Sequence, residues 1–210
     1  NTVQLLARHF DQQFEDADTV AADLIDQINL AEITSPAMFR ERMTGPTTNR
    51  FLRDKISSVS YLGDIVIYDS EGEILNWSRA QPLPKINISS RAYFQTFKTD
   101  PASNPVLMES VHSFVIGKWT TIVARRLSLP DGTFVGVMVR RIDPDSYQRY
   151  FASVLLPDGA AISLFDGDGK MMARYPNVDH LVGSSFRDAP LMREVLAKGG
   201  QQTLRHKSPI

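Results

Sequence analysis

The chain has 210 residues, of which 42% are hydrophobic and 22% charged, a composition that indicates one large or two small globular domains and excludes a disordered or fibrous protein. Its net charge is −1 and its 23 lysines and arginines are dispersed, which excludes the clustered basic face that binds nucleic acid. Cysteine is absent, so the chain has no disulfide, thiolate metal site or catalytic thiol.

No apolar run approaches the roughly 20 residues that cross a bilayer, and no signal peptide is recognisable. The sequence begins on Asn1 rather than methionine and ends shortly after a strand-like run, residues 201–206. We therefore interpret it as a piece of a longer protein.

The beginning of the chain carries a sustained heptad pattern. Its apolar positions follow one another at alternating spacings of four and three residues: Val3, Ala7, Phe10, Phe14, Ala17, Ala21, Leu24 and Ile28. The pattern predicts one long helix, and we assign residues 1–34 to this segment. We expect the stripe to pack on its own domain along most of its length; a dimer seam near the N-terminus is the alternative.

Two short helices and a hairpin follow. Ser35 before Pro36 is typical of a helix N-cap, and residues 45–46 separate this helix from the next one. The apolar runs 64–69 and 73–77, with a Glu-Gly turn between them, then predict a β-hairpin.

The hairpin pattern recurs in the second half of the chain. Residues 65–75 and 162–172 share the order apolar, any, apolar, aromatic, Asp, small, acidic, Gly, charged, apolar, apolar. This repeat predicts two modules of one kind in tandem, which we place at residues 35–143 and 144–210. Far fewer residues follow the second hairpin than the first, so the second module is expected to be incomplete.

The segment 106–143 predicts three consecutive antiparallel strands, because apolar and β-branched residues dominate it. Two breaks divide the segment. Gly117 and Lys118 suit a two-residue hairpin, and residues 129–132 have the signature of a type I turn.

The order of these motifs resembles the double Cache sensor domain, the tandem PAS-like extracytoplasmic module of bacterial histidine kinases, diguanylate cyclases and chemoreceptors. Besides the long leading helix, the resemblance rests on Tyr68-Asp69 with its Glu-Gly turn and on residues 90–94, 117–119, 131–137 and 142–144. It covers essentially the whole chain. The resemblance implies an α+β fold in which the long N-terminal helix accompanies two PAS-like modules with antiparallel sheets.

The resemblance also implies a function. We expect a periplasmic sensor domain of an inner-membrane protein, a histidine kinase in the first instance, with a diguanylate cyclase or chemoreceptor as other hosts. Such a domain binds a small molecule in its membrane-distal module, here residues 35–143, forms a homodimer, and meets the membrane only through flanking helices outside this sequence. The alternative is a non-sensing dimerisation module whose pocket is filled by Trp119, Phe97 and Met138.

No pattern in the chain indicates an enzyme. The four histidines share no spacing typical of a metal site or a catalytic triad, and no nucleophile elbow, zinc-protease or phosphate-loop motif occurs. The acidic run 166–169 is better explained as a hairpin turn than as a calcium loop, because Lys170 would stand at a ligand position. We therefore expect no catalytic residue, no metal ligand and no cofactor.

The two turns of the segment 106–143 set a strand register that brings polar side chains together. In this register His112 lies opposite Val123, and Arg140 lies near Thr121. We predict a ligand site formed by Arg91, Tyr93, Phe94, Ser110, His112, Trp119, Thr121, Arg140 and Asp143.

Ser89 or Ser90 is expected to cap a short helix that carries Arg91, and the resemblance implies that this helix covers the mouth of the pocket. Arg91 is suited to grip a carboxylate through two parallel hydrogen bonds, to which Tyr93 adds a hydroxyl. The alternative is that Arg91 pairs with an acid such as Glu109 and that the neighbouring aromatic residues are ordinary core.

Some members of the family recognise amino acids through a tyrosine five positions before the arginine and a Trp-Tyr pair two positions after it. Here Ile86 stands at the first position and Tyr93-Phe94 at the second. The departure makes a carboxylate or another small polar molecule the expected ligand, rather than an α-amino acid.

Overall fold

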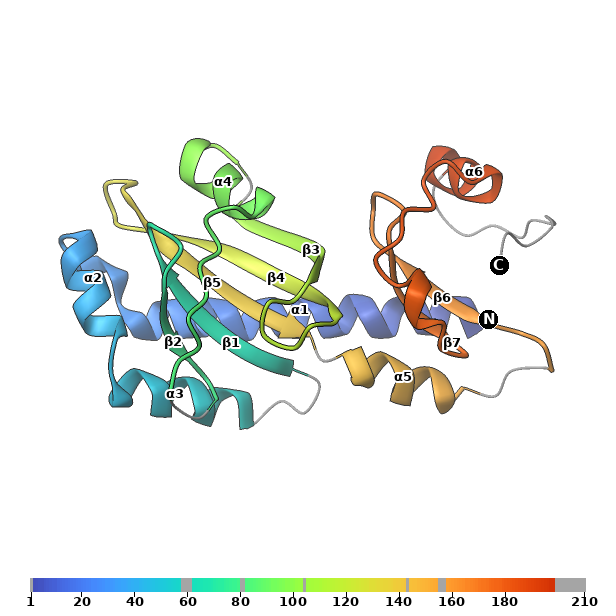
Figure 1. Ribbon diagram of the computed structural model, residues 1–210, viewed down its shortest axis with the longest axis horizontal. Coiled ribbons are helices and arrows are strands. Elements are labelled where there is room, and N and C mark those ends of the chain that lie inside the picture. Colours follow the sequence, from blue (N-terminus) through green and yellow to red (C-terminus); the bar gives the residue numbers. More distant parts are fainter. Residues whose placement is uncertain are drawn as a thin grey trace.

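The computed structural model describes residues 2–57, 62–79, 82–103, 105–142, 144–154 and 158–198 (Figure 1). Its helices are α1 (Thr2–Ile28), α2 (Pro36–Met43), α3 (Pro46–Ser57), α4 (Ala92–Thr99), α5 (Pro144–Ala152) and α6 (Pro190–Lys198), with short 3-10 helices at Leu30–Glu32 and Asp179–Leu181. Its strands are β1 (Leu62–Asp69), β2 (Ile74–Trp77), β3 (Val106–His112), β4 (Trp119–Ser128), β5 (Phe134–Ile142), β6 (Ile162–Phe165) and β7 (Met171–Tyr175). The predicted α+β fold is confirmed.

Helix α1 runs along both sheets of the molecule (Figure 1). Its second half packs on the first module through Leu24 and Ile28, and its first half packs on the second module through Leu6 and Phe10. The apolar stripe therefore packs into the core of this chain at these positions, as expected. Ala7, another residue of the stripe, is exposed. Within the described ranges, no helix is both long and apolar enough to cross a membrane.

The sheet of the first module has the order β2-β1-β5-β4-β3, and every neighbouring pair is antiparallel. Successive residues of a strand point to opposite faces, so each strand supplies two layers. On one face, α1, α2 and α3 bury Phe39 and Leu52 against β1 and β5. On the other face, α4 buries Phe94 and Phe97.

The second module contributes the two-stranded sheet β6-β7 from the described residues, together with α6. Helix α5 joins the two modules and packs on β7 (Figure 1). Tyr147 and Phe151 of α5 are buried with Phe10 of α1, which forms a third apolar cluster between the modules.

Both hairpins turn in the same way. Oδ1 of Asp69 accepts hydrogen bonds from the N–H groups two and four residues ahead, both at 2.9 Å, and Oδ1 of Asp166 does the same at 3.0 and 2.9 Å. In each case the glycine three residues after the aspartate accepts a backbone hydrogen bond from the segment that leads into the next helix: Gly72 from Ile88, and Gly169 from Phe186. We call residues 69–73 and 166–170 the aspartate turns. The sequence repeat is therefore also a repeat of hydrogen bonding.

The strand register differs from the one expected. Strand β3 ends at His112 and β4 begins at Trp119, and these two residues pair with each other, so a six-residue loop replaces the two-residue hairpin. The expected pairing of His112 with Val123 is thus wrong by four residues. Strand β5 pairs Arg140 with Val123 rather than with Thr121, a slip of two. The type I turn is confirmed, since the N–H of Gly132 donates to the carbonyl oxygen of Leu129 at 2.9 Å and neither Pro130 nor Asp131 has the positive φ that other hydrogen-bonded turns require.

The N-cap of α2 offers a test of local structure. Oγ of Ser35 accepts a hydrogen bond from the N–H of Met38 at 3.2 Å, as expected from the sequence. Ser35→Ala is expected to lower the free energy of unfolding by about 1 kcal/mol, because a first-turn N–H loses its acceptor. Urea denaturation measures this change. Ser90→Ala, at an exposed serine, is the control, and equal midpoints for both variants would contradict the assigned cap.

Candidate ligand-binding site

A small cavity lies between the sheet of the first module and the segment that leads into α4. Its floor is the sheet face that carries Val66, Ile122 and Val139, from β1, β4 and β5. Ile88 and Arg91 form part of its cover. The cavity has a volume of about 60 Å³ and mostly apolar walls, so the few polar groups that reach it decide what it binds.

Two tyrosine hydroxyls belong to this cavity. Tyr68 of β1 and Tyr93 of α4 line it, and each is only 5% exposed. Neither hydroxyl has a hydrogen-bond partner within the described part of the chain. Burial raises the pKa of both phenols above the ordinary tyrosine value, so both are neutral hydrogen-bond donors. A phenol hydroxyl at the wall of a cavity can donate a hydrogen bond to a ligand or to water in that cavity.

Arg91 closes one side of the cavity. Its Nη2 donates to the carbonyl oxygen of His112 at 2.7 Å, and its guanidinium carbon lies 3.7 Å from the ring centroid of Phe114. Its charge opposes the effect of burial on the pKa of Tyr68 and Tyr93, which indicates that the guanidinium lies near both phenols. Arg91 makes these contacts rather than the alternative ion pair with Glu109 on β3.

An acid and two further cations occupy another part of the wall. Asp64 accepts from Nε of Arg79 at 2.5 Å and from Nε of Arg141 at 3.1 Å. Asp64 and Arg141 line the cavity. Both carboxylate oxygens of Asp64 thus accept a hydrogen bond. Within the described ranges, Nη1 and Nη2 of Arg141 have no partner. In the described ranges, no group of three or more His, Asp or Glu side chains is placed to hold a metal ion.

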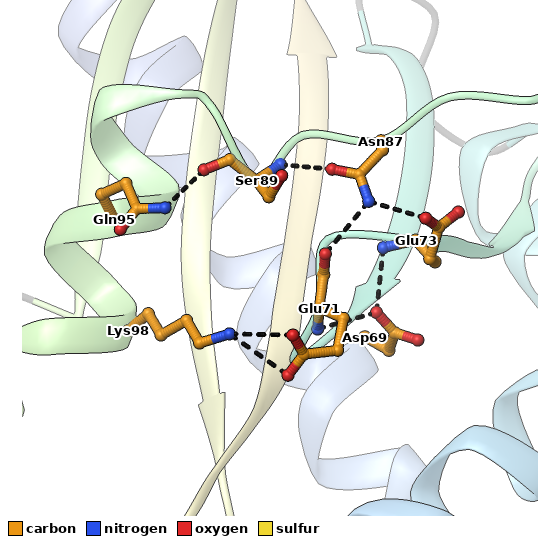
Figure 2. A network of polar contacts seen from close by, with 7 residues as sticks. All are labelled: Asp69, Glu71, Glu73, Asn87, Ser89, Gln95 and Lys98. Atoms are coloured by element: carbon orange, nitrogen blue, oxygen red, sulfur yellow. Dashed lines mark hydrogen bonds and ion pairs between the residues drawn. The ribbon is translucent and has the colours of Figure 1, made fainter.

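A polar network fixes the cover of the cavity to the first aspartate turn (Figure 2). Nδ2 of Asn87 donates to Oε1 of Glu73 at 2.7 Å and to the carbonyl oxygen of Glu71 at 3.1 Å. Oδ1 of Asn87 accepts from the N–H of Ser89 at 2.7 Å, and Nζ of Lys98 on α4 pairs with Glu71 at 3.1 Å. The turn therefore sets the position of α4, and with it the position of Arg91 at the N-cap of this helix. The serine cap expected at this helix is wrong, because Arg91 occupies the N-cap.

Part of the predicted ligand site lies at this cavity. Arg91 and Tyr93 line it, and Phe94 is fully buried in the apolar cluster beside it. Asp143 lies outside the described residues.

The other predicted residues lie elsewhere. Ser110, Thr121 and Arg140 are buried on the opposite sheet face, since their strand neighbours line the cavity. The hydroxyl of Thr121 faces that of Tyr147 on α5, whose pKa burial raises to about 12. His112 and Trp119 line a separate cavity between the two modules.

The residues that the sequence analysis missed are Tyr68, Asp64 and Arg141. The register slips of four and two residues did not cause this, because an even slip keeps every side chain on its face. The cause was the choice of face: the Thr121 side of β4 was assigned to the pocket, whereas the adjacent Thr120 side lines it. Choosing the other face would have selected Arg141 in place of Arg140.

Comparisons with known proteins agree with this architecture. Residues 144–210 match a family model described as dCache_1_like, a histidine kinase sensor domain. No curated protein matches the chain.

Solved structures match nearly the whole chain. The extracellular domain of rpHK1S-Z16, described as a histidine kinase, is 26% identical, with a TM-score of 0.75 over 90% of this chain and 73% of that one. An extracellular ligand-binding receptor from Desulfohalobium retbaense is 16% identical, with a TM-score of 0.71 over 95% of this chain and 34% of that one. The ligand-binding domain of the Campylobacter jejuni chemoreceptor Tlp3, in complex with 4-methylisoleucine, is 16% identical, with a TM-score of 0.57 over 90% of this chain and 72% of that one.

Proposed function

Because the chain has the fold of double Cache sensor domains, and its residues 144–210 match their family model, we propose that it senses a small carboxylate in the cavity of its first module. The resemblance drawn from the sequence is confirmed at the level of an extracellular ligand-binding sensor domain. The observation that carries the proposal is the convergence of donors on the cavity: the hydroxyls of Tyr68 and Tyr93, which have no partner among the described residues, flanked by Arg91 and Arg141.

The chemistry of these groups favours an anion. Neutral phenols donate one hydrogen bond each, and guanidinium groups only donate. The acid in the wall, Asp64, is already paired with two guanidinium groups, those of Arg79 and Arg141, which offset its negative charge. A carboxylate supplies the acceptors that the donors lack, and arginine binds carboxylates with two parallel hydrogen bonds.

The volume of the cavity limits the size of the ligand. One water-sized group occupies about 10–15 Å³ of such volume, so a cavity of about 60 Å³ takes about four to six non-hydrogen atoms. Acetate, propionate and lactate have this size, and the apolar walls suit a short alkyl chain. The ligand in the Campylobacter receptor structure, 4-methylisoleucine, is larger, and the tyrosine and Trp-Tyr positions typical of amino acid recognition are replaced here.

The filled-pocket alternative finds less support. Of the three side chains that it requires, Met138 packs in the cluster on the α1 side and Trp119 lines the cavity between the modules. Phe97 lies on the ligand side, but in the core rather than in the cavity wall. The space beneath Tyr93 is open.

The proposal places residues 35–143 as the ligand-binding module, distal to the membrane, and residues 144–210 as the membrane-proximal module. The host is a histidine kinase by this proposal, acting as a homodimer with the sensor domain in the periplasm. Ligand contacts at Arg91 and at Arg141 of β5 shift the cover and the sheet relative to α5, which packs on β7 of the second module.

Thermal shift and calorimetry against acetate, propionate, lactate, glycine and methylamine test the ligand class. We expect the carboxylates to raise the melting temperature and methylamine to leave it unchanged. Arg91→Ala is expected to weaken the best ligand at least about tenfold, because a charge-assisted hydrogen bond contributes about 1.5–3 kcal/mol.

Arg187→Ala is the matched control, because Arg187 is an exposed cation whose partner, Asp168, is also exposed. It should leave the affinity within about twofold. Full affinity in Arg91→Ala would disprove the site assignment. The absence of any stabilising carboxylate would favour the non-sensing dimerisation module instead.

A further inference from the structure

A second and larger cavity separates the two modules. Its volume is about 370 Å³, within the range of about 300–1,000 Å³ that is typical of small-molecule sites. The loop between β3 and β4 supplies one wall through Lys118 and Trp119, and α5 supplies Gln148. Met172 of β7 and Val182 belong to the second module. An occupant would therefore touch both modules at once.

Several polar groups around this cavity have unused hydrogen-bonding capacity. Within the described residues, the ammonium group of Lys118 and the indole N–H of Trp119 have no partner, and neither has the imidazole of His112. The amide nitrogen of Gln148 donates to the carbonyl oxygen of Arg174 at 2.9 Å, which orients this side chain. The acid in the wall, Asp145, has an interaction of its own. Lys118 is thus a charged side chain of the wall that has no ion pair within the described residues.

Trp119 gives the cavity a rigid aromatic wall. Its ring lies directly against the backbone of Gly183, where there is no room for a side chain. His112 packs edge-on against the same ring with centroids 5.9 Å apart, and Nζ of Lys170 lies 6.0 Å from the ring centroid. Lys170 is also held by the carbonyl oxygen of Ser110 at 3.4 Å. The indole is therefore fixed by contacts from both modules, and the part of it that lines the cavity is a preformed aromatic contact for a ligand.

From these features we infer that the cavity between the modules binds a small organic anion with a planar apolar part, such as an aromatic carboxylate. Lys118 and the indole N–H of Trp119 hold its charged group, and the indole contacts its ring. This site is separate from the cavity under Tyr93, whose volume of about 60 Å³ excludes a ligand of this size. Its existence does not depend on the ligand proposed there.

Nuclear magnetic resonance of the 210-residue chain tests the inference through the indole N–H signals of Trp119 and Trp77, assigned with Trp77→Phe. The probes are benzoate, its neutral analogue benzamide and its cationic analogue benzylamine. We expect benzoate to shift the Trp119 signal with saturation, at least about tenfold more tightly than benzamide, and benzylamine to show no saturation. Trp77 lines neither cavity and serves as an internal reference.

Variants assign the site. Lys118→Ala is expected to weaken benzoate at least about tenfold, since it removes the charged donor. Lys85→Ala makes the same change of charge at an exposed lysine outside the cavity and should leave the affinity within about twofold, as should Tyr93→Phe. No saturable shift of Trp119 with benzoate would overturn the inference, and so would equal affinity for benzoate and benzamide or an unchanged affinity in Lys118→Ala.

Discussion

Gly136→Ala is expected to lower the free energy of unfolding by about 3 kcal/mol, because the new methyl group collides with backbone rather than with a side chain that can move. Gly136 lies on β5 between Asp69 of β1 and Leu127 of β4. A Cβ atom at this position would overlap the carbonyl oxygen of Tyr68. The sheet must open locally to accept it, which breaks ladder hydrogen bonds of the central strand.

Thermal and urea denaturation measure this effect. A loss of about 3 kcal/mol corresponds to a fall of about 6–12 °C in the melting temperature of a chain of this size. Gly45→Ala is the matched control, because a Cβ atom there meets no other atom within 4 Å. Equal melting temperatures for the two variants would contradict the close approach of β5 to β1. Because Tyr68 also lines the ligand cavity, the Gly136 variant should bind carboxylates more weakly at temperatures where it is folded.

Gly183→Ala is expected to uncouple the second module from the first. A Cβ atom at Gly183 would overlap the indole ring of Trp119, and the backbone φ of +85° is strained for any residue with a side chain. The N–H of Gly183 donates to the carbonyl oxygen of Met171 at 2.7 Å, so the glycine cannot simply move aside. The indole must leave its place, at a cost of about 2–4 kcal/mol for strain and overpacking together.

Tryptophan fluorescence and hydrogen exchange report this change. We expect a red-shifted emission from Trp119 and faster amide exchange in β7, while β1 and β5 keep their protection. Gly167→Ala, at a glycine of the same module with no atom within 4 Å of a new Cβ, is the control and should leave both readouts unchanged. A Gly183 variant with native emission and native exchange would show that the modules are held together by other contacts.

The elements of this fold were predictable where the local signal is strong. The heptad stripe around Leu24 and Ile28 and the cap at Ser35 each depend on neighbours in the sequence, and both are present as expected. The length of the loop after His112 was not predictable. Ser113 closes it by accepting hydrogen bonds from the N–H groups of Val115 and Ile116, at 3.2 and 3.3 Å. Those contacts compete with the two-residue hairpin that the glycine alone favours.

The candidate site was predictable only in part. Arg91 and Tyr93 were found because they lie together on one short helix next to a turn. Tyr68 and Arg141 were missed because the alternation of residues along a strand only sorts them into two sheet faces. It does not show which face is packed tightly by a helix and which face keeps a cavity. That decision depends on the packing of α1 and α4, which join the sheet from distant parts of the sequence.

The two aspartate turns bear on the history of the chain. Their hydrogen bonds align the modules residue by residue: Arg91 and Ala189 each donate to the carbonyl oxygen three residues before, and each accepts from the N–H group four residues after. In this alignment the second module has Phe165 in place of Tyr68 and Leu191 in place of Tyr93. A duplication followed by divergence accounts for the pattern: the turns that build both copies are the same, whereas the guanidinium and both phenols occur in the first copy alone. The second copy instead contributes contacts with Trp119 that join it to the first.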